Sequence, residues 1–136
     1  MALSDWMADY QNRRLAELHL PGSHDAGTVK GFVDLTRLGT VSNAVTQNLT
    51  ITQQLAAGTR FFDLRLASKS TGQVVPHHTT AGQGAYGSLS VDRTLESAAL
   101  WCSVHRTEVA IFRISHTSLD TRAHEIVKRS GMGSLH

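Results

Sequence analysis

The sequence of 136 residues has only one cysteine and two prolines, and it contains no apolar run of about eighteen residues, the minimum for crossing a bilayer. The single cysteine, Cys102, excludes an internal disulfide framework, and we expect it to be a small buried apolar residue. Lysines and arginines are scattered rather than gathered in a block, which argues against a nucleic-acid partner. Met1–Tyr10 holds two acids and no long apolar segment, so we expect no secretory signal there.

What is present suits one packed domain. Hydrophobic residues make up 40% of the chain and charged residues 18%, a composition typical of a folded protein rather than of a disordered tail. The length fits a single domain, residues 1–136, that is large enough to bury a core. The net charge of +2 is compatible with approach to an anionic lipid surface but does not imply it.

Local patterns predict strands that alternate with helices. Thr50–Gln53 fits a capping box, and the helix that it starts should stop at Gly58. The positions Val91, Leu95, Ala98 and Cys102 share one face of a second helix. We expect helices at 4–10, 50–57, 90–103 and 121–129, strands at 15–20, 60–66, 74–78 and 109–114, irregular structure at 28–47 and a glycine-rich loop at 82–87. This order favours a parallel α/β arrangement.

Three polar clusters, at residues 23–25, 63–65 and 77–78, fall at or near the ends of predicted strands. In a (β/α) barrel the loops after the strands form the active site, so these clusters would meet at one mouth. Two histidines could take and give a proton, and an arginine could neutralise charge that develops on phosphate oxygens. A carboxylate beside each histidine would fix its tautomer and support its charged form.

Each cluster also has a plainer interpretation, which the residues alone leave open. His24 could be a surface or capping residue after the Pro21-Gly22 turn, and Asp25 could satisfy loop amides. Asp63 and Arg65 would share one face of a strand and could form an exposed ion pair of little energetic value.

Four motifs in order resemble the catalytic (X) domain of phosphatidylinositol-specific phospholipase C, in its bacterial form. Leu20–Thr28 is similar to the opening motif of that family, and Gln53–Arg65 to its second motif. The pair His77-His78 matches the histidines on the next strand, and Trp101–Ile114 resembles a later helix–strand unit. The resemblance covers nearly all of residues 6–116 and implies the N-terminal half of a distorted TIM-type (β/α) barrel.

The resemblance also implies roles in the cleavage of an inositol phospholipid at a membrane surface. His24 would be the general base on the inositol 2-hydroxyl, which attacks phosphorus to give a cyclic inositol phosphate. Arg65 would bind the phosphate and stabilise its charge, and His78 would protonate the diacylglycerol leaving oxygen. Asp25 would pair with His78, and Asp63 would support the Arg65 region. His116, which follows a predicted strand, is a further candidate substrate contact.

Arg65 bears on metal dependence as well. Related calcium-dependent enzymes place calcium where the bacterial form places a guanidinium, so Asp63-Leu64-Arg65 implies no metal and no cofactor. A zinc or magnesium ion among the histidines and aspartates is the alternative.

The length raises a second alternative. A full barrel needs about 250 residues, roughly twice this chain. The carboxylate that pairs with the first histidine in the family comes from a later strand, and no residue here matches it. A half barrel would expose strand edges, so we expect the chain either to be a fragment or to assemble with a partner chain, possibly a second copy, that completes the barrel. The chain would then be either an enzyme or a catalytically impaired module that binds phosphoinositides or inositol phosphates.

Overall fold

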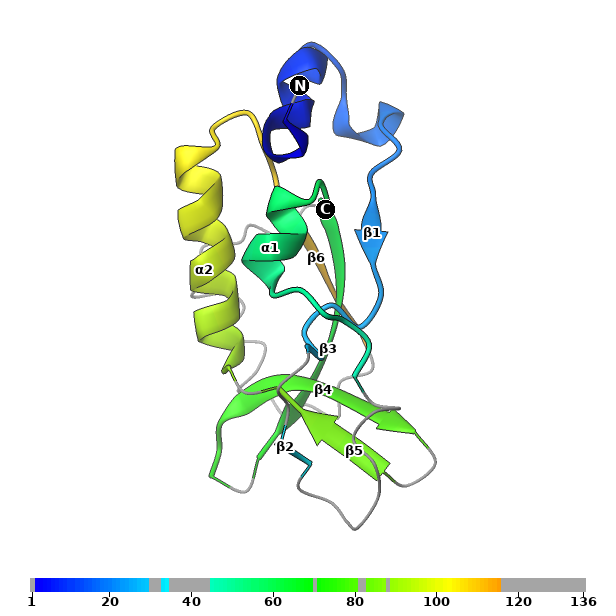
Figure 1. Cartoon of the computed structure of the whole chain (residues 1–136), viewed down its shortest axis with the longest axis vertical. Coiled ribbons are helices and arrows are strands. Elements are labelled where there is room, and N and C mark those ends of the chain that lie inside the picture. The colour runs from blue at the N-terminus through cyan, green and yellow to red at the C-terminus, as the bar shows by residue number, and fades with distance from the viewer. Residues whose placement is uncertain are drawn as a thin grey trace.

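The computed structural model describes residues 2–29, 33–34, 45–69, 71–80, 83–87 and 89–115. Most of the segment predicted to be irregular, the predicted helix at 121–129 and His116 lie outside these residues. The elements in chain order are η1 (Leu3–Tyr10), η2 (Leu15–Glu17), β1 (Gly22–Ser23), β2 (Val33–Asp34), α1 (Ile51–Ala56), β3 (Phe61–Ser68), β4 (Val74–Thr80), β5 (Gln83–Tyr86), α2 (Val91–Val104) and β6 (Ile111–Ser115) (Figure 1).

Strand β3 is the centre of the sheet. Its first half pairs in parallel with β1 on one side and with β6 on the other, and its last residues pair antiparallel with β4. Strands β5 and β2 continue from β4, again antiparallel. Among the residues that the structure describes, β1 and β6 pair on one side only, so the parallel part of the sheet stays open.

The predicted parallel arrangement is therefore right for β1, β3 and β6 but wrong for β4. The loop predicted at 82–87 is also wrong, because residues 83–86 form β5. Connection length explains both errors. Five residues join β3 to β4 and two join β4 to β5, whereas a parallel crossover needs about a dozen or more. Short connections can only form hairpins.

The first predicted strand, at 15–20, is wrong as well. Residues Leu15–Glu17 form a 3₁₀ turn, and the strand lies instead at Gly22–Ser23. Pairing with β3 begins at Pro21, whose carbonyl accepts hydrogen bonds from the backbone N–H groups of Arg60 (3.0 Å) and Phe61 (3.1 Å). The Pro21-Gly22 break thus lies where the strand starts.

Both α-helices begin after a capping residue, and the cap of α1 is the one predicted from the sequence. At α1 the Thr50 hydroxyl accepts from the Gln53 N–H (3.4 Å) and the Gln53 side chain accepts from the Thr50 N–H (2.9 Å), the predicted capping box. Gly58, just beyond the helix, has a φ of +103°, which glycine adopts without strain. At α2 the Ser90 hydroxyl caps the Arg93 N–H. The predicted first helix is a 3₁₀ helix without a side-chain cap.

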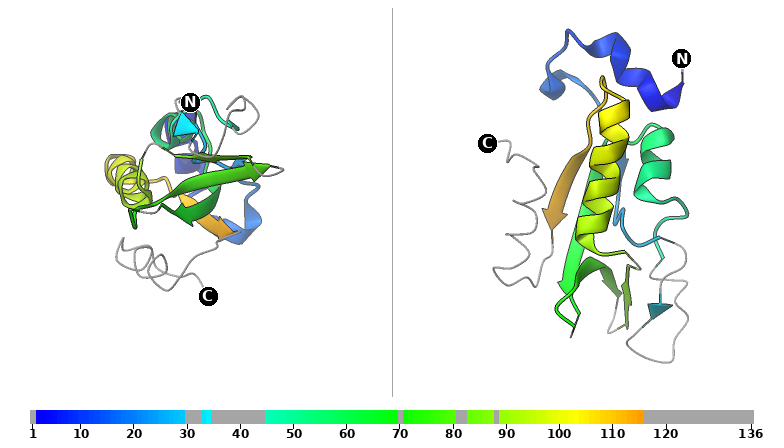
Figure 2. Two further views of the ribbon diagram at one scale, coloured as in Figure 1. Left: turned by 90° about the horizontal axis from the view of Figure 1, so that it is seen from below. Right: turned by 90° about the vertical axis from the view of Figure 1, so that its left-hand side faces the viewer.

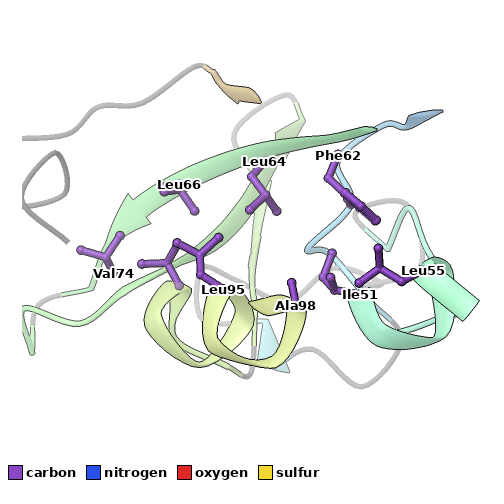
Figure 3. Close-up of a cluster of buried hydrophobic side chains, with 10 residues drawn as sticks. Ile51, Leu55, Phe62, Leu64, Leu66, Val74, Leu95 and Ala98 are labelled. Carbon is purple, nitrogen blue, oxygen red and sulfur yellow. The ribbon is translucent and has the colours of Figure 1, made fainter. Parts of the chain in front are cut away.

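The hydrophobic core lies between β3 and the two α-helices (Figures 2 and 3). Alternate β3 residues point into it, and α1 and α2 contribute their apolar faces; the labelled side chains are Ile51, Leu55, Phe62, Leu64, Leu66, Val74, Leu95 and Ala98. Cys102 is only half-buried, and burial raises the pKa of its thiol. No helix within the described ranges is long and apolar enough to cross a membrane.

Candidate active site

The turn after β1 carries His24 and Asp25 and is tied to β3. The Ala26 N–H donates to the Asp63 carbonyl (2.8 Å), and the Thr28 and Thr46 hydroxyls donate to the Asp25 carbonyl (2.9 and 2.8 Å). Asp25 has a φ of +47°, in the left-handed region that costs a residue with a side chain some free energy. The surrounding hydrogen bonds hold this strained residue in place.

Strand β3 supplies Asp63 and Arg65 two residues apart, so both side chains lie on one face of the sheet. Arg65 pairs with Ser115, the last residue of β6, and marks the carboxyl end of the parallel pairing. His78 comes from β4, which folds back over the end of β3. The three predicted clusters therefore meet at the end of the parallel strands, where a (β/α) barrel places its active site.

Asp25 is the centre of this cluster. Its side chain is fully buried, and His78 Nδ1 lies 2.6 Å from Asp25 Oδ2. Arg65 Nε lies 2.7 Å from Asp25 Oδ1, an ion-pair distance, although this N–H is not aligned with the oxygen as a hydrogen bond requires. One oxygen of the buried Asp25 carboxylate thus faces His78, and the other faces the Arg65 guanidinium.

His24 lies on the solvent side of the cluster, with 66% of its side chain exposed. Its Nε2 lies 3.3 Å from an Arg65 guanidinium nitrogen and 3.2 Å from Asp25 Oδ2. Its Nδ1 lies 3.4 Å from Asp63 Oδ2. The Gln47 side chain donates to the His24 carbonyl (2.8 Å) and holds its backbone. An exposed histidine with buried polar neighbours can meet a substrate and still keep its orientation.

The charges of the cluster act on Asp63. Burial raises the pKa of its carboxyl, but the hydrogen bond from the Ser115 hydroxyl and the positive charges of Arg65, His24 and Arg113 together hold this pKa below its ordinary value. Asp63 is consequently a carboxylate at neutral pH.

His77, the neighbour of His78, differs from it. Its ring lies against Tyr86 at 5.3 Å between centroids. Burial, together with the nearby His78 and Arg65, holds the pKa of His77 below its ordinary value, although Asp25 acts in the opposite direction. This strand therefore has one histidine in contact with a carboxylate and one kept neutral against an aromatic ring.

A metal ion could find ligands here. Single ligand atoms of His24, Asp25 and Asp63 lie within 4.8 Å of one another. Arg65 Nε already lies 2.7 Å from Asp25 and 3.6 Å from Asp63, so a guanidinium supplies positive charge at the place a cation would take.

The structure brings together five of the six residues selected from the sequence: His24, Asp25, Asp63, Arg65 and His78. The sixth, His116, lies outside the described residues. The sequence analysis missed Ser115 and Gln47, which contact Asp63 and His24. Ser115 carried a usable signal, because it is a polar residue at the end of an apolar parallel strand.

The open parallel sheet, with helices over one face and a polar cluster at its carboxyl end, defines the class of the protein: an incomplete TIM-type (β/α) barrel. Phosphatidylinositol-specific phospholipase C of Staphylococcus aureus has the same fold. An H258Y mutant of that protein matches with a TM-score of 0.70 at 23% identity, over 95% of this chain and 42% of its own.

Sequence comparison gives the family. No family model matches the chain. PI-PLC X domain-containing protein 2 of Mus musculus is 36% identical over 88 residues, which is 48% of this chain and 26% of the relative. The human PI-PLC X domain-containing proteins 1 and 3 are 31% and 29% identical over 81% and 85% of this chain, and 41% and 43% of their own. The chain belongs to the PI-PLC X domain family, and it spans less than half the length of these relatives.

Proposed function

We propose that this chain carries the catalytic centre of a phosphodiesterase that cleaves phosphatidylinositol-type phospholipids to diacylglycerol and a cyclic inositol phosphate. The observation that carries the proposal is the convergence of two histidines and an arginine on the buried Asp25. His78 lies 2.6 Å and Arg65 2.7 Å from this carboxylate, and Arg65 lies 3.3 Å from His24. This is the residue set that acid–base cleavage of a phosphodiester uses.

The proposed roles follow from what each nitrogen faces. The exposed His24 would take the proton of the inositol 2-hydroxyl as its oxygen bonds to phosphorus. Arg65, whose side chain is 23% exposed at the end of the parallel pairing, would bind the phosphate and offset its charge. His78, whose Nδ1 is held by Asp25, would donate from Nε2 to the diacylglycerol oxygen as the phosphorus–oxygen bond breaks. The proton taken and the proton given balance.

A second candidate function is binding without turnover. The chain spans less than half the length of its relatives, and the parallel sheet is open at both flanking strands within the described ranges. The same Arg65 and histidines could hold an inositol phosphate or a phosphoinositide headgroup in a module that another chain, or a second copy, completes.

A release assay tests the proposal. Vesicles containing phosphatidylinositol are incubated with the wild type, His24→Ala and His78→Ala, and water-soluble inositol phosphate is measured. We expect each substitution to reduce release by about 100-fold or more, since general acid–base groups contribute about that much. His19→Ala, which replaces an exposed histidine outside the cluster, is the matched control and should keep wild-type activity. Equal background from all four proteins would favour the binding module.

Metal dependence is tested in the same assay. We propose that cleavage needs no metal, because the Arg65 guanidinium lies beside both Asp25 and Asp63. Release should be unchanged by EDTA. Loss of release in EDTA, with recovery on adding calcium, would instead assign a cation to His24, Asp25 and Asp63.

A further inference from the structure

The two ring nitrogens of His24 face different groups: Nε2 lies 3.3 Å from the Arg65 guanidinium and 3.2 Å from Asp25 Oδ2, and Nδ1 lies 3.4 Å from Asp63 Oδ2. An arginine can only donate and a carboxylate can only accept, so Nε2 finds a partner in either tautomer, but the proposed function needs Nε2 as the accepting nitrogen of the neutral ring. In that tautomer the proton is on Nδ1, which faces Asp63 Oδ2. This tautomer is the one that leaves Nε2 able to take a proton.

Asp63 is itself held by a residue on the neighbouring strand. The Ser115 hydroxyl donates to Asp63 Oδ1 at 2.6 Å, and it comes from the last position of β6, opposite Arg65. This bond uses one carboxylate oxygen and turns the other toward His24. The Asp63 backbone is fixed separately, because its carbonyl accepts from the Ala26 N–H on the turn that carries His24.

We infer that Ser115 is a positioning residue for His24, acting through the Asp63 carboxylate. The inference rests on the proposed function, in which His24 takes a proton at Nε2. It differs from the expectation from the sequence that no residue of this chain matches the carboxylate that pairs with the first histidine in the family. It also extends the part expected of Asp63, which lies nearer to His24 Nδ1 (3.4 Å) than to Arg65 Nε (3.6 Å).

The chemistry gives the contact a purpose. When Nε2 gains a proton the ring becomes a cation, and the charged groups that face it are Asp25, Asp63 and Arg65. Asp63 and Asp25 stabilise that cation, while Arg65 opposes it. Asp25 also faces His78 and Arg65, so Asp63 is the carboxylate that Ser115 keeps directed at His24.

Nitrogen-15 NMR of the histidine side chains tests this inference without reference to activity. In the full chain at a pH where His24 is neutral, the wild type should show the Nδ1–H tautomer at His24. Ser115→Ala should shift His24 toward a mixture of tautomers and leave His78 unchanged. Ser115→Thr retains a hydroxyl and should restore the wild-type spectrum. Ser103→Ala, which removes a hydroxyl bonded only locally to the Leu100 carbonyl, is the matched control.

Asp63→Ala gives the same test from the other partner and serves where Ser115→Ala does not fold. A wild-type His24 tautomer in either variant, with a folded backbone spectrum, would overturn the inference. In the release assay Ser115→Ala should lower kcat/KM by about tenfold, as expected for loss of a hydrogen bond to a charged group, and Ser115→Thr should recover it. If Ser115→Ala changes the His24 tautomer but the wild type cleaves no lipid, the positioning role of Ser115 would be supported and the proposed function would be overturned.

Discussion

Two arginines five residues apart, one just before β3 and one within it, have opposite surroundings. Arg60 directly precedes the strand and is 0% exposed, whereas Arg65 lies where the parallel pairing ends and its side chain is 23% exposed. Both have an acidic neighbour in space. They differ in how many of their donors the fold uses, and that number separates a structural arginine from a site arginine.

Every donor nitrogen of Arg60 has a partner. Its Nε and one terminal nitrogen bind the buried Glu108 carboxylate, and its terminal nitrogens also donate to four backbone carbonyls, those of Leu3, Ser4, Leu55 and Thr59. The rings of Trp6 and Trp101 lie 5.7 and 5.1 Å from the guanidinium carbon. Arg60 thus ties η1, α1 and α2 to the start of the sheet, and it has no donor left for a ligand.

Arg65 is used far less. Among the described residues, its guanidinium has one hydrogen-bond partner, His24 Nε2, and an unaligned ion pair with Asp25. Planar donors that have no partner among the described residues, next to solvent and two histidines, suit an anionic group such as a phosphate. Arg65 therefore keeps guanidinium donors for a ligand, whereas the donors of Arg60 are already bonded within the protein.

The largest effect that we expect comes from breaking the Arg60 cluster. Glu108→Ala leaves a buried guanidinium without its carboxylate and should lower the free energy of unfolding by about 3–5 kcal/mol. Urea unfolding followed by circular dichroism measures the loss, with the exposed Glu96→Ala as control. A loss no larger than that of the control would mean that Arg60 is not the structural member of the pair.

The sequence predicted local features of this molecule better than nonlocal ones. The capping box predicted at Thr50 lies within four residues and starts α1. The helix predicted at 90–103 from its apolar spacing is α2. Strand direction depends on connection length and partners, so the strand predicted at 74–78 is present as β4 but runs antiparallel, and β5 was predicted to be a loop.

The candidate site shows the same limit. The resemblance implied the pairing of Asp25 with His78, 53 residues away, but nothing in the sequence distinguished Arg60 from Arg65 as a buried structural residue. The Ser115–Asp63 contact depends on the register of β3 with β6, which no local pattern specifies.

The next largest effect is expected at Arg65, where a substitution should change activity rather than stability. Arg65→Lys keeps the charge but loses the planar fork, so lipid cleavage should fall by about 100-fold, roughly 2.7 kcal/mol of transition-state stabilisation. The free energy of unfolding should change by less than about 1 kcal/mol, since partly exposed ion pairs contribute little. The release assay and urea unfolding on the same preparation check both parts. A large stability loss with full activity would reverse the assignment of the two arginines.

A third substitution disturbs the end of β3 near Arg65 and the candidate site, here called the Arg65 end, and leaves the cluster of Arg60 and Glu108, the Arg60 end, intact. A Cβ at Gly27 would lie 2.6 Å from Pro76 Cγ and 3.0 Å from Leu64 Cδ2, so the turn that carries His24 and Asp25 would have to shift. Gly27→Ala should lower the free energy of unfolding by about 1–3 kcal/mol, the usual cost of overpacking. Gly22→Ala is the matched control, because its Cβ would meet Phe61 at 3.6 Å, an ordinary contact. Equal stabilities would show that the turn is not tightly packed on β3 and β4.

The smallest effect concerns pH at the Arg65 end. The Ser115 hydroxyl and the positive charges of Arg65, His24 and Arg113 outweigh burial and lower the pKa of Asp63 in the folded protein. A lowered folded-state pKa means that the stabilisation is fully present above the ordinary carboxyl pKa, about 3.9, and is lost as the pH falls through the folded value. Asp63→Asn should therefore be less stable than the wild type at pH 7, and the difference should shrink as the pH falls below about 4, where the carboxyl of the unfolded chain gains a proton before that of the folded protein does.

Urea unfolding of both proteins from pH 7 to pH 3 measures this difference, with the exposed Asp9→Asn as control. Glu108 gives the contrast at the other end of β3. Glu108→Ala removes the carboxylate of the Arg60 cluster and should lower the free energy of unfolding at neutral pH. In the same pH range Asp63→Asn should lower it by its full amount, which is smaller. A constant gap between wild type and Asp63→Asn down to pH 3 would show that the carboxylate form of Asp63 contributes nothing to stability. The charge of Asp63 would then not matter for stability around Arg65, in contrast to the charge of Glu108 around Arg60.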